Sequence, residues 1–177
     1  MEDRSMERIV VIGNSGGGKS LLSRQLAGKL NLPCVEVDSI LWQSGWRLVP
    51  EATYNAEHAR LIAQERWLID GLGTRSSIPA RLARATGIVL IDMPLWIHFS
   101  LAAERQAEWA AGKLQHPPAA ISEAPPIRAL FRTIWEVDRE WMPEIRELVA
   151  REKGRGKRTF EVTALDQLDR FLSRTDL

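Results

Sequence analysis

Residues 8–20 read RIVVIGNSGGGKS, and this stretch decides the fold. Its first part, Arg8–Ile12, is a continuous apolar run rich in β-branched side chains, which is typical of a strand buried on both faces in a parallel sheet. After the glycines, leucines recur at helical spacing up to Leu30, so we expect a helix that begins at Lys19. A strand, a glycine-rich turn and a helix in this order predict a phosphate-binding P-loop.

The glycine-rich turn matches the P-loop pattern of a glycine, four residues and then Gly18, Lys19 and Ser20. Glycines let backbone N–H groups turn inward around phosphate oxygens, and the helix start adds a positive partial charge. Lys19 is expected to reach the β- and γ-phosphates, and the Ser20 hydroxyl to ligate Mg²⁺. ATP and Mg²⁺ are therefore the expected cofactors. The predicted nucleotide-binding residues are Gly13, Asn14, Ser15, Gly16, Gly17, Gly18, Lys19, Ser20 and Leu21.

Strands are expected to alternate with helices along the rest of the chain. The further predicted strands are Cys34–Asp38, Trp67–Asp70, Gly87–Asp92 and Arg158–Val162. The predicted helices are Ala52–Arg66, Leu95–Gly112 and Ile127–Ala150, the last kinked or restarted at Pro143. This alternation predicts an α/β fold, a P-loop NTPase-like three-layer sandwich with a five-stranded parallel sheet and helices on both faces.

A proline-rich stretch interrupts the alternation. Pro117, Pro118, Pro125 and Pro126 cannot continue a helix, and they predict a loop between two long helices. A helix–loop–helix inserted between the fourth and fifth strands is where a helical lid would lie, although a plain surface connection fits the pattern equally well. We expect one domain over residues 1–177, with 95–150 as the lid and its supporting helices.

Composition narrows the class of protein. The chain has 177 residues, of which 45% are hydrophobic and 27% charged, the balance of a globular domain with a real core. Lys and Arg number 24 against 23 Asp and Glu, and this formal charge of +1 disfavours a general nucleic-acid or membrane-surface binder. The single cysteine, Cys34, cannot form an internal disulfide, and neither a signal peptide nor a membrane helix is recognisable. We therefore expect a cytoplasmic protein without membrane or nucleic-acid partners, and the sequence leaves its oligomeric state open.

Asp92 ends the fourth predicted strand and is the predicted second partner of Mg²⁺. Alternatively it simply caps the next helix, since Pro94 follows two residues later. Met93 stands where hydrolytic P-loop ATPases generally carry a glutamate, and no Asn-Lys-x-Asp guanine-reading motif occurs. The sequence therefore disfavours both a motor ATPase and a GTPase switch.

Four segments in order, IVVIGNSGGGKS, VEVDSILW…GW, WLIDG and IVLIDMP, resemble the adenylate-kinase-like small P-loop kinases. They look most similar to the branch labelled DNA topology modulation proteins. The resemblance covers about Arg8 to Pro94 well and the rest of the chain loosely. In that family the residues after the second and third strands form the acceptor pocket, and a lid supplies arginines to the transferring phosphate.

The resemblance implies acceptor-site roles for residues that follow the second and third strands. Asp38, expected at the end of a strand beside the P-loop strand, would orient an acceptor hydroxyl or take its proton. Trp42 and Trp46 could stack on a planar acceptor, and Gly71 and Gly73 could let a backbone amide approach it. The alternatives are a helix cap for Asp38, core packing for the tryptophans and an ordinary turn for the glycines.

The resemblance also implies roles for arginines. Arg105 is the candidate for clamping the phosphoryl group, unless it forms a surface ion pair with a neighbouring glutamate. Arg81 matches a family arginine that would contact the acceptor. The first lid helix carries fewer arginines than its relatives do, and Arg128 and Arg132 on the second could compensate. Residues 163–165 occupy the position of the loop that brackets adenine.

The sequence therefore predicts an ATP-dependent phosphotransferase, an enzyme in which Lys19, Asp38 and Arg105 are catalytic. The γ-phosphate would move to a small-molecule acceptor, with a nucleotide or nucleoside favoured by the resemblance. The lid with few arginines keeps a small hydroxylated metabolite open, because a hydroxyl acceptor needs a base more than it needs cations around a phosphate. A nucleotide-binding regulatory or DNA-associated protein with little turnover is the rival from another class.

Overall fold

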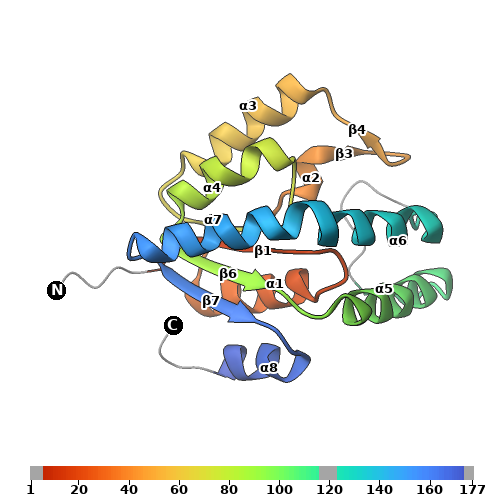
Figure 1. Cartoon of the computed structure of the whole chain (residues 1–177). Coiled ribbons are helices and arrows are strands. Elements are labelled where there is room, and N and C mark those ends of the chain that lie inside the picture. Colours follow the sequence, from red (N-terminus) through yellow and green to blue (C-terminus); the bar gives the residue numbers. More distant parts are fainter. Residues whose placement is uncertain (1–5, 116–122, 174–177) are drawn as a thin grey trace.

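The computed structural model describes residues 6–115 and 123–173. At its centre lies a five-stranded sheet in the order β2-β5-β1-β6-β7, with every neighbouring pair parallel (Figure 1). The strands are β1 (Arg8–Gly13), β2 (Cys34–Glu36), β5 (Trp67–Asp70), β6 (Gly87–Ile91) and β7 (Arg158–Val162). The predicted parallel sheet is thereby confirmed. The carboxyl ends of its strands meet at one edge, where α/β sheets bind ligands.

The position of β2 corrects one expectation. β2 ends at Glu36, and Asp38 is the first residue of a short helix, α2 (Asp38–Leu41), instead of the end of a strand. β2 is also not the neighbour of β1, because β5 pairs with β1 and separates the two. The P-loop strand therefore lies between β6 and β5, and β5 ends in Asp70.

The central strand β1 is covered on both faces. Ile9 and Val11 point into one apolar cluster, and Val10 and Ile12 into the other; all four are fully buried. One cluster packs against α1 (Lys19–Leu30), α5 (Leu95–Ala110) and α8 (Leu165–Ser173). The other packs against α2, α3 (Glu51–Ile62), α4 (Ile78–Arg84) and α7 (Met142–Gly154). Burial on both faces is the physical reason for the uninterrupted apolar run in β1.

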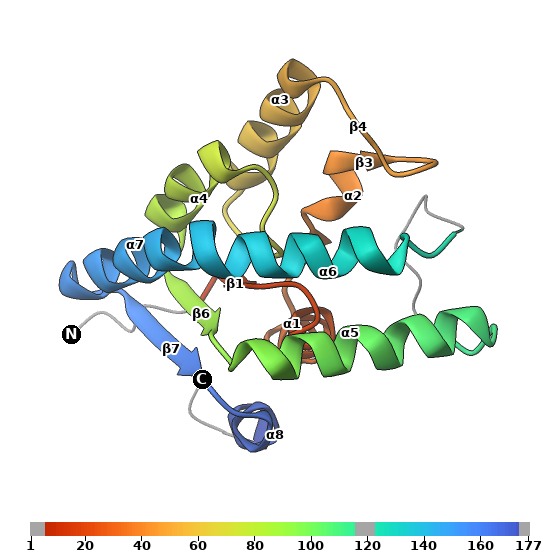
Figure 2. The same ribbon diagram turned by 45° about the vertical axis from the view of Figure 1, so that its right-hand side comes forward.

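Two helices extend past the carboxyl edge of the sheet. They are α5 and α6 (Ile127–Glu136), which lie side by side in both views (Figure 2). Phe99 and Phe131 join them, with ring centroids 5.1 Å apart. A π-helical turn, η2 (Val137–Trp141), connects α6 to α7, and Pro143 lies in the first turn of α7. The expected break near Pro143 is confirmed, and Pro117 and Pro118 of the connecting loop lie outside the described residues.

Between α2 and α3 the chain forms a small element that the sequence did not predict. Strands β3 (Trp42–Gln43) and β4 (Arg47–Leu48) pair in an antiparallel hairpin. Its turn places both Gly45, with φ 73°, and Trp46, with φ 55°, in the left-handed region. Among the described residues, no helix combines the length and apolar character needed to cross a lipid bilayer.

The burial of His58 in α3 leads to a prediction about how stability depends on pH. His58 is 4% exposed, and its Nε2 atom has no hydrogen-bond partner among the described residues. Burial, assisted by the charge of Arg81, lowers the pKa of His58 to about 4. Because an unfolded histidine takes up a proton near pH 6.5, the free energy of unfolding should fall as pH drops from about 6.5 to about 4, by at most about 3 kcal/mol.

Denaturant unfolding at several pH values checks this for the wild type and for His58→Leu. The leucine variant should lose this part of the pH dependence, because it has no proton to bind in either state. Other titrating groups cancel when the two profiles are subtracted. A difference profile that is flat between pH 4 and 6.5 would show that His58 titrates alike in the folded and unfolded chains.

Candidate active site around the P-loop

The P-loop is a tight turn whose glycines are required by conformation and by space. Gly16 and Gly18 both have φ 76°, a conformation that side chains other than glycine rarely adopt. A Cβ atom on Gly16 would lie 2.5 Å from the His98 carbonyl oxygen, and one on Gly17 would lie 2.9 Å from His98 Cε1. The loop therefore packs directly against α5. Gly18 precedes α1, so the positive end of that helix faces the turn.

Lys19 lies in the P-loop near the carboxylates of Asp70, which ends β5, and Asp38, which begins α2. Its ammonium donates a hydrogen bond of 2.7 Å to the Asn14 carbonyl oxygen. Burial lowers the pKa of Lys19, while the two carboxylates act in the opposite direction. These carboxylates therefore help to keep the buried ammonium charged.

A cleft of about 450 Å³ opens above the P-loop. It is lined by residues 16–21, by Glu36 from β2 and by side chains of α5 that include Leu101 and Arg105. Arg105 also interacts electrostatically with Lys19 and Asp38. The structure thus brings together Lys19, Asp38 and Arg105, the three predicted catalytic residues, and their catalytic roles stay predictions.

Asp38, in the first turn of α2, is close enough to Lys19 and Arg105 to interact with both charges. Crowding by protein atoms raises the pKa of Asp38, and the charge of Lys19 is the largest influence in the opposite direction. Because Asp38 is exposed, solvent moderates this desolvation. A carboxylate so placed can accept a proton from, or orient, a hydroxyl group held over the P-loop.

Asp70 is a site residue that the sequence analysis missed. It ends β5, is 2% exposed, and hydrogen-bonds the side chain of Ser20, the predicted Mg²⁺ ligand. Burial raises the pKa of Asp70 to about 6, and its Oδ1 atom has no partner among the described residues. The signal was present, since WLID ends in aspartate as the predicted strands Cys34–Asp38 and Gly87–Asp92 do. Only the tertiary structure shows that this aspartate contacts the P-loop serine.

Glu36 was also missed. It ends β2, lines the cleft, and forms an ion pair of 3.1 Å with Arg24 of α1. Residues 6–115 and 123–173 contain no group of three or more His, Cys, Asp or Glu side chains that could hold a metal ion.

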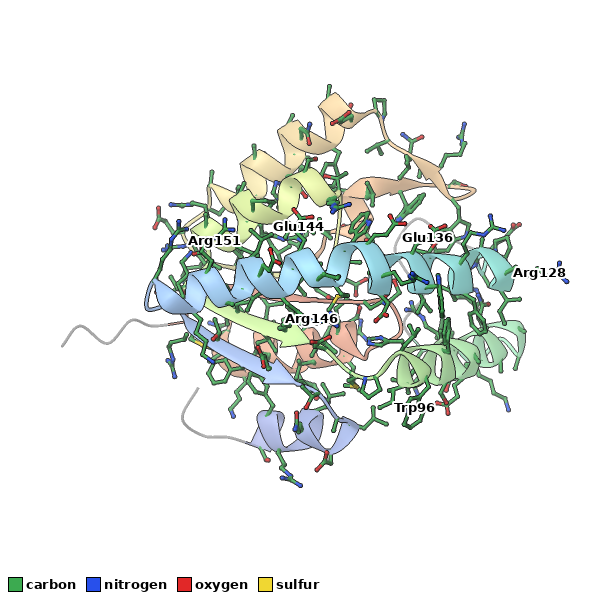
Figure 3. The ribbon with its side chains drawn as sticks, in the orientation of Figure 1. Trp96, Arg128, Glu136, Glu144, Arg146 and Arg151 are labelled. Atoms are coloured by element: carbon green, nitrogen blue, oxygen red, sulfur yellow. The ribbon has the colours of Figure 1, made fainter. Side chains whose placement is uncertain are left out.

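Asp92, the Mg²⁺ partner predicted from the sequence, forms an ion pair with an arginine. Both its carboxylate oxygens accept hydrogen bonds of 2.7 Å from Arg146 of α7. Figure 3 shows Arg146 reaching from α7 toward the end of β6. Asp92 is also absent from the residues that line the P-loop cleft. Its role as a metal partner stays a prediction, and Asp70 now competes for that role.

The turn after β5 holds two of the predicted acceptor-site residues, and Arg81 of α4 supports it. Gly71 has φ 106° and Gly73 has φ 66°. Arg81 has no exposed surface and donates hydrogen bonds to the carbonyl oxygens of Gly71, at 2.9 Å, and Leu72, at 2.8 Å. Its Nε and Nη1 atoms have no partner among the described residues, and burial lowers its pKa. Arg81 therefore supports the turn, and contact with an acceptor stays a prediction.

The two predicted stacking residues belong to the β3–β4 hairpin. Trp42 and Trp46 contact each other edge to face, with centroids 5.7 Å apart. Trp42 lines a second hollow, between the hairpin and α3, that includes no P-loop residue. The indole N–H of Trp46 donates a hydrogen bond of 3.0 Å to the Glu123 carbonyl oxygen. These contacts give both rings a packing role, and stacking on an acceptor stays a prediction.

The remaining residues to which the resemblance assigns a role lie in separate parts of the structure. Arg128 lies at the outer end of α6 and points away from the sheet (Figure 3). The Thr163 amide N–H donates to the Gln167 side chain at 2.7 Å, just before α8. A Cβ on Gly18 would lie 3.3 Å from Leu168 of α8, so this helix does border the P-loop. Bracketing of adenine by residues 163–165 stays a prediction.

Comparisons with known proteins agree with a kinase-like fold. No family model matches the chain. A shikimate kinase of Enterococcus faecalis is 32% identical over 85 residues, which make up 48% of this chain and 49% of that protein. The chain thus spans about half the length of this curated relative.

Solved structures match over nearly the whole chain. A gluconokinase from Sinorhizobium meliloti gives a TM-score of 0.57 at 18% identity, covering 96% of this chain and 89% of that one. A shikimate kinase from Acinetobacter baumannii in complex with shikimate gives 0.59 at 14% identity, covering 96% and 92%. At such identities the likeness establishes the fold alone. The chain therefore has the small P-loop kinase fold, with a five-stranded parallel sheet between helices.

The turn at Gly73 yields a prediction with a matched control. An added Cβ on Gly73 would overlap the Tyr54 hydroxyl oxygen, and the backbone there has φ 66°. Gly73→Ala should therefore lower the free energy of unfolding by about 3 kcal/mol, from overpacking and backbone strain together. Gly112 has φ 67° with no atom within 4 Å of an added Cβ, so Gly112→Ala should cost only about 1 kcal/mol.

Denaturant unfolding of the two variants measures both losses. Their difference isolates the contact with Tyr54, because the backbone strain is common to both. Equal losses would mean that Gly73 is needed only for its backbone conformation.

Proposed function

We propose that the protein is an ATP-dependent kinase of a small hydroxylated metabolite. The observation that carries this proposal is the electrostatic grouping of Asp38 and Arg105 with Lys19 of the P-loop, beside a cleft that Lys19 and Arg105 line. The site combines a phosphate-binding turn with a carboxylate that can serve a hydroxyl acceptor. The similar proteins described above are shikimate kinases and a gluconokinase, and both activities belong to this class of reaction.

The nucleotide side of the site fits ATP with Mg²⁺. Backbone amides of the P-loop, the start of α1 and Lys19 would hold the phosphates. Ser20 and Asp70, which already hydrogen-bond each other, would hold Mg²⁺. The metal would neutralise charge that develops on the phosphates, and Arg105 would add a second cation from α5.

The acceptor side favours a hydroxyl group over a phosphate. Asp38, Asp70 and Glu36 place negative charge near the P-loop lysine, which repels a doubly charged phosphate on the acceptor more strongly than a hydroxyl compound with at most one carboxylate. The nearby guanidinium groups are engaged, because Arg81 is fully buried on two carbonyls and Arg75 pairs with Glu144. A nucleoside monophosphate needs cations around its own phosphate, and among the described residues these arginines do not offer them.

A nucleoside is the second candidate acceptor, and it rests on one observation. The rings of Trp42 and Trp46 lie close to Asp38 in sequence and offer aromatic surface to a planar base. The resemblance to the branch labelled DNA topology modulation proteins stays a prediction, as does a DNA-associated role. The near-neutral formal charge of +1 argues against such a role.

Acceptor-dependent release of ADP tests the proposal. The purified chain with ATP and Mg²⁺ should release ADP faster with some neutral or carboxylated polyols than with nucleoside monophosphates. Nucleosides form the third arm of the screen. Release that depends only on a nucleoside monophosphate would replace the proposed acceptor class, and release with no acceptor dependence would favour the regulatory alternative.

With an active acceptor in hand, Asp38→Asn should lower kcat by about 100-fold or more while KM for ATP changes little. The reason is that the amide no longer takes the proton of the acceptor hydroxyl. Glu51→Gln, which removes an exposed carboxylate from the first turn of α3, is the matched control and should retain activity. Full turnover by Asp38→Asn would remove the base from the mechanism.

Two variants test whether Asp70 or Asp92 takes part in binding Mg²⁺. Asp70→Asn should raise the Mg²⁺ concentration needed for half-maximal activity by at least about tenfold, because it weakens a partner of Ser20. Asp92→Asn should leave the Mg²⁺ requirement unchanged, since Arg146 occupies both oxygens of Asp92. The reverse pattern in a Mg²⁺ titration would restore Asp92 as the metal partner.

A further inference from the structure

A hydrogen bond from His98 of α5 connects the P-loop to a helix other than α1, which directly follows the loop in the chain. This side chain is 1% exposed, and its Nδ1 lies 2.9 Å from the Ser15 carbonyl oxygen. A carbonyl oxygen can only accept, so Nδ1 carries the proton and donates it. The ring also hydrogen-bonds the backbone of Met93. His98 is thus fixed in orientation, and its ring fills the space beside Gly17 that a Cβ would need.

A second buried contact ties the loop to α6. Asn14 is 1% exposed, and its Nδ2 donates a hydrogen bond of 2.8 Å to the Ile134 carbonyl oxygen. Its Oδ1 accepts a hydrogen bond of 2.8 Å from the Ser15 backbone N–H. Ile134 lies three residues before the π-helical turn η2, a type of irregularity that is frequent at functional sites. Ser15 is therefore held through its N–H by Asn14 and through its carbonyl by His98.

We propose that His98 and Asn14 are positioning residues that clamp the P-loop in its phosphate-binding conformation and tie it to α5 and α6. The inference rests on the proposed function in so far as the loop must bind a nucleotide. His98 and Arg105 are seven residues apart on α5, so they share one face of that helix. The clamp therefore also sets the position from which Arg105 reaches the cleft.

The clamp acts by preorganisation. A loop that is already ordered loses less freedom when it binds an anion, so affinity is higher than for the same loop unclamped. The net contribution of one buried hydrogen bond corresponds to about a tenfold change in an equilibrium constant. Loss of the His98 contact should therefore weaken nucleotide binding by about tenfold, without direct contact between His98 and the nucleotide.

Calorimetric titration of the full chain with MgADP tests this, because it needs no acceptor. His98→Leu should raise Kd about tenfold. His98→Asn should restore most of the affinity, because the asparagine amide nitrogen can occupy the place of Nδ1, whereas His98→Gln places its amide near Nε2 and should not. Asn14→Ala should weaken binding independently.

His58→Leu is the matched control. It removes the other well-buried histidine, from α3, and should leave Kd unchanged although it also alters stability. In the kinase assay, His98→Leu should raise KM for ATP and lower kcat through Arg105, with KM for the acceptor little changed.

The outcomes separate the clamp from the proposed function. If the wild type takes up no MgADP, the proposed function itself fails. The clamp is contradicted if the wild type binds MgADP and His98→Leu binds it with the same Kd. It is also contradicted if His98→Leu raises Kd no more than His58→Leu does. If His98→Leu does not fold, His98→Asn and His98→Gln still test the clamp. Equal Kd values for MgADP in these two variants would contradict it.

Discussion

The absence of side chains on the glycines between β1 and α1 is the constraint on which the rest of the structure depends. Gly16 and Gly18 adopt φ 76°, and His98 of α5 lies where a Cβ on Gly16 or Gly17 would have to go. This close approach fixes where α5 begins relative to the sheet, and therefore which of its side chains reach the cleft. It also turns backbone amides toward the space in which an anion would bind.

Charge then distinguishes the two sides of the cleft. The P-loop, the start of α1, Lys19 and Arg105 are positive, whereas Glu36, Asp38 and Asp70 end the neighbouring strands or begin α2 as carboxylates. Burial raises the pKa of Asp70 to about 6, and the hydrogen bond from Ser20 partly offsets this effect. This separation of charge is the reason why a hydroxyl compound is the proposed acceptor, with the polyphosphate and its metal proposed on the positive side.

Two residues show how sequence reasoning succeeds and fails in this chain. The P-loop was identified because its residue types and spacing are local, and the structure places them as the motif requires. Asp92 and Asp70 both end apolar strands, so local pattern treats them alike. Side-chain contacts set them apart, since β5 and β6 both pair with β1. Asp70 hydrogen-bonds Ser20, whereas both oxygens of Asp92 are bound by Arg146, 54 positions further along the chain. Similarly, nothing local shows that Arg81 is buried on the Gly71 and Leu72 carbonyls.

The sequence by itself determined the alternation of strands and helices, the five parallel strands and the phosphate-binding turn. Hydrophobic periodicity and glycine positions act within a few residues, so they can be read without a structure. Only the tertiary structure decided that β5 lies between β2 and β1, that Asp70 hydrogen-bonds Ser20, and that the P-loop is bonded to His98 of α5 and, through Asn14, to Ile134 of α6. These contacts join residues up to 120 positions apart, and their partners are chosen by packing, which local pattern does not encode.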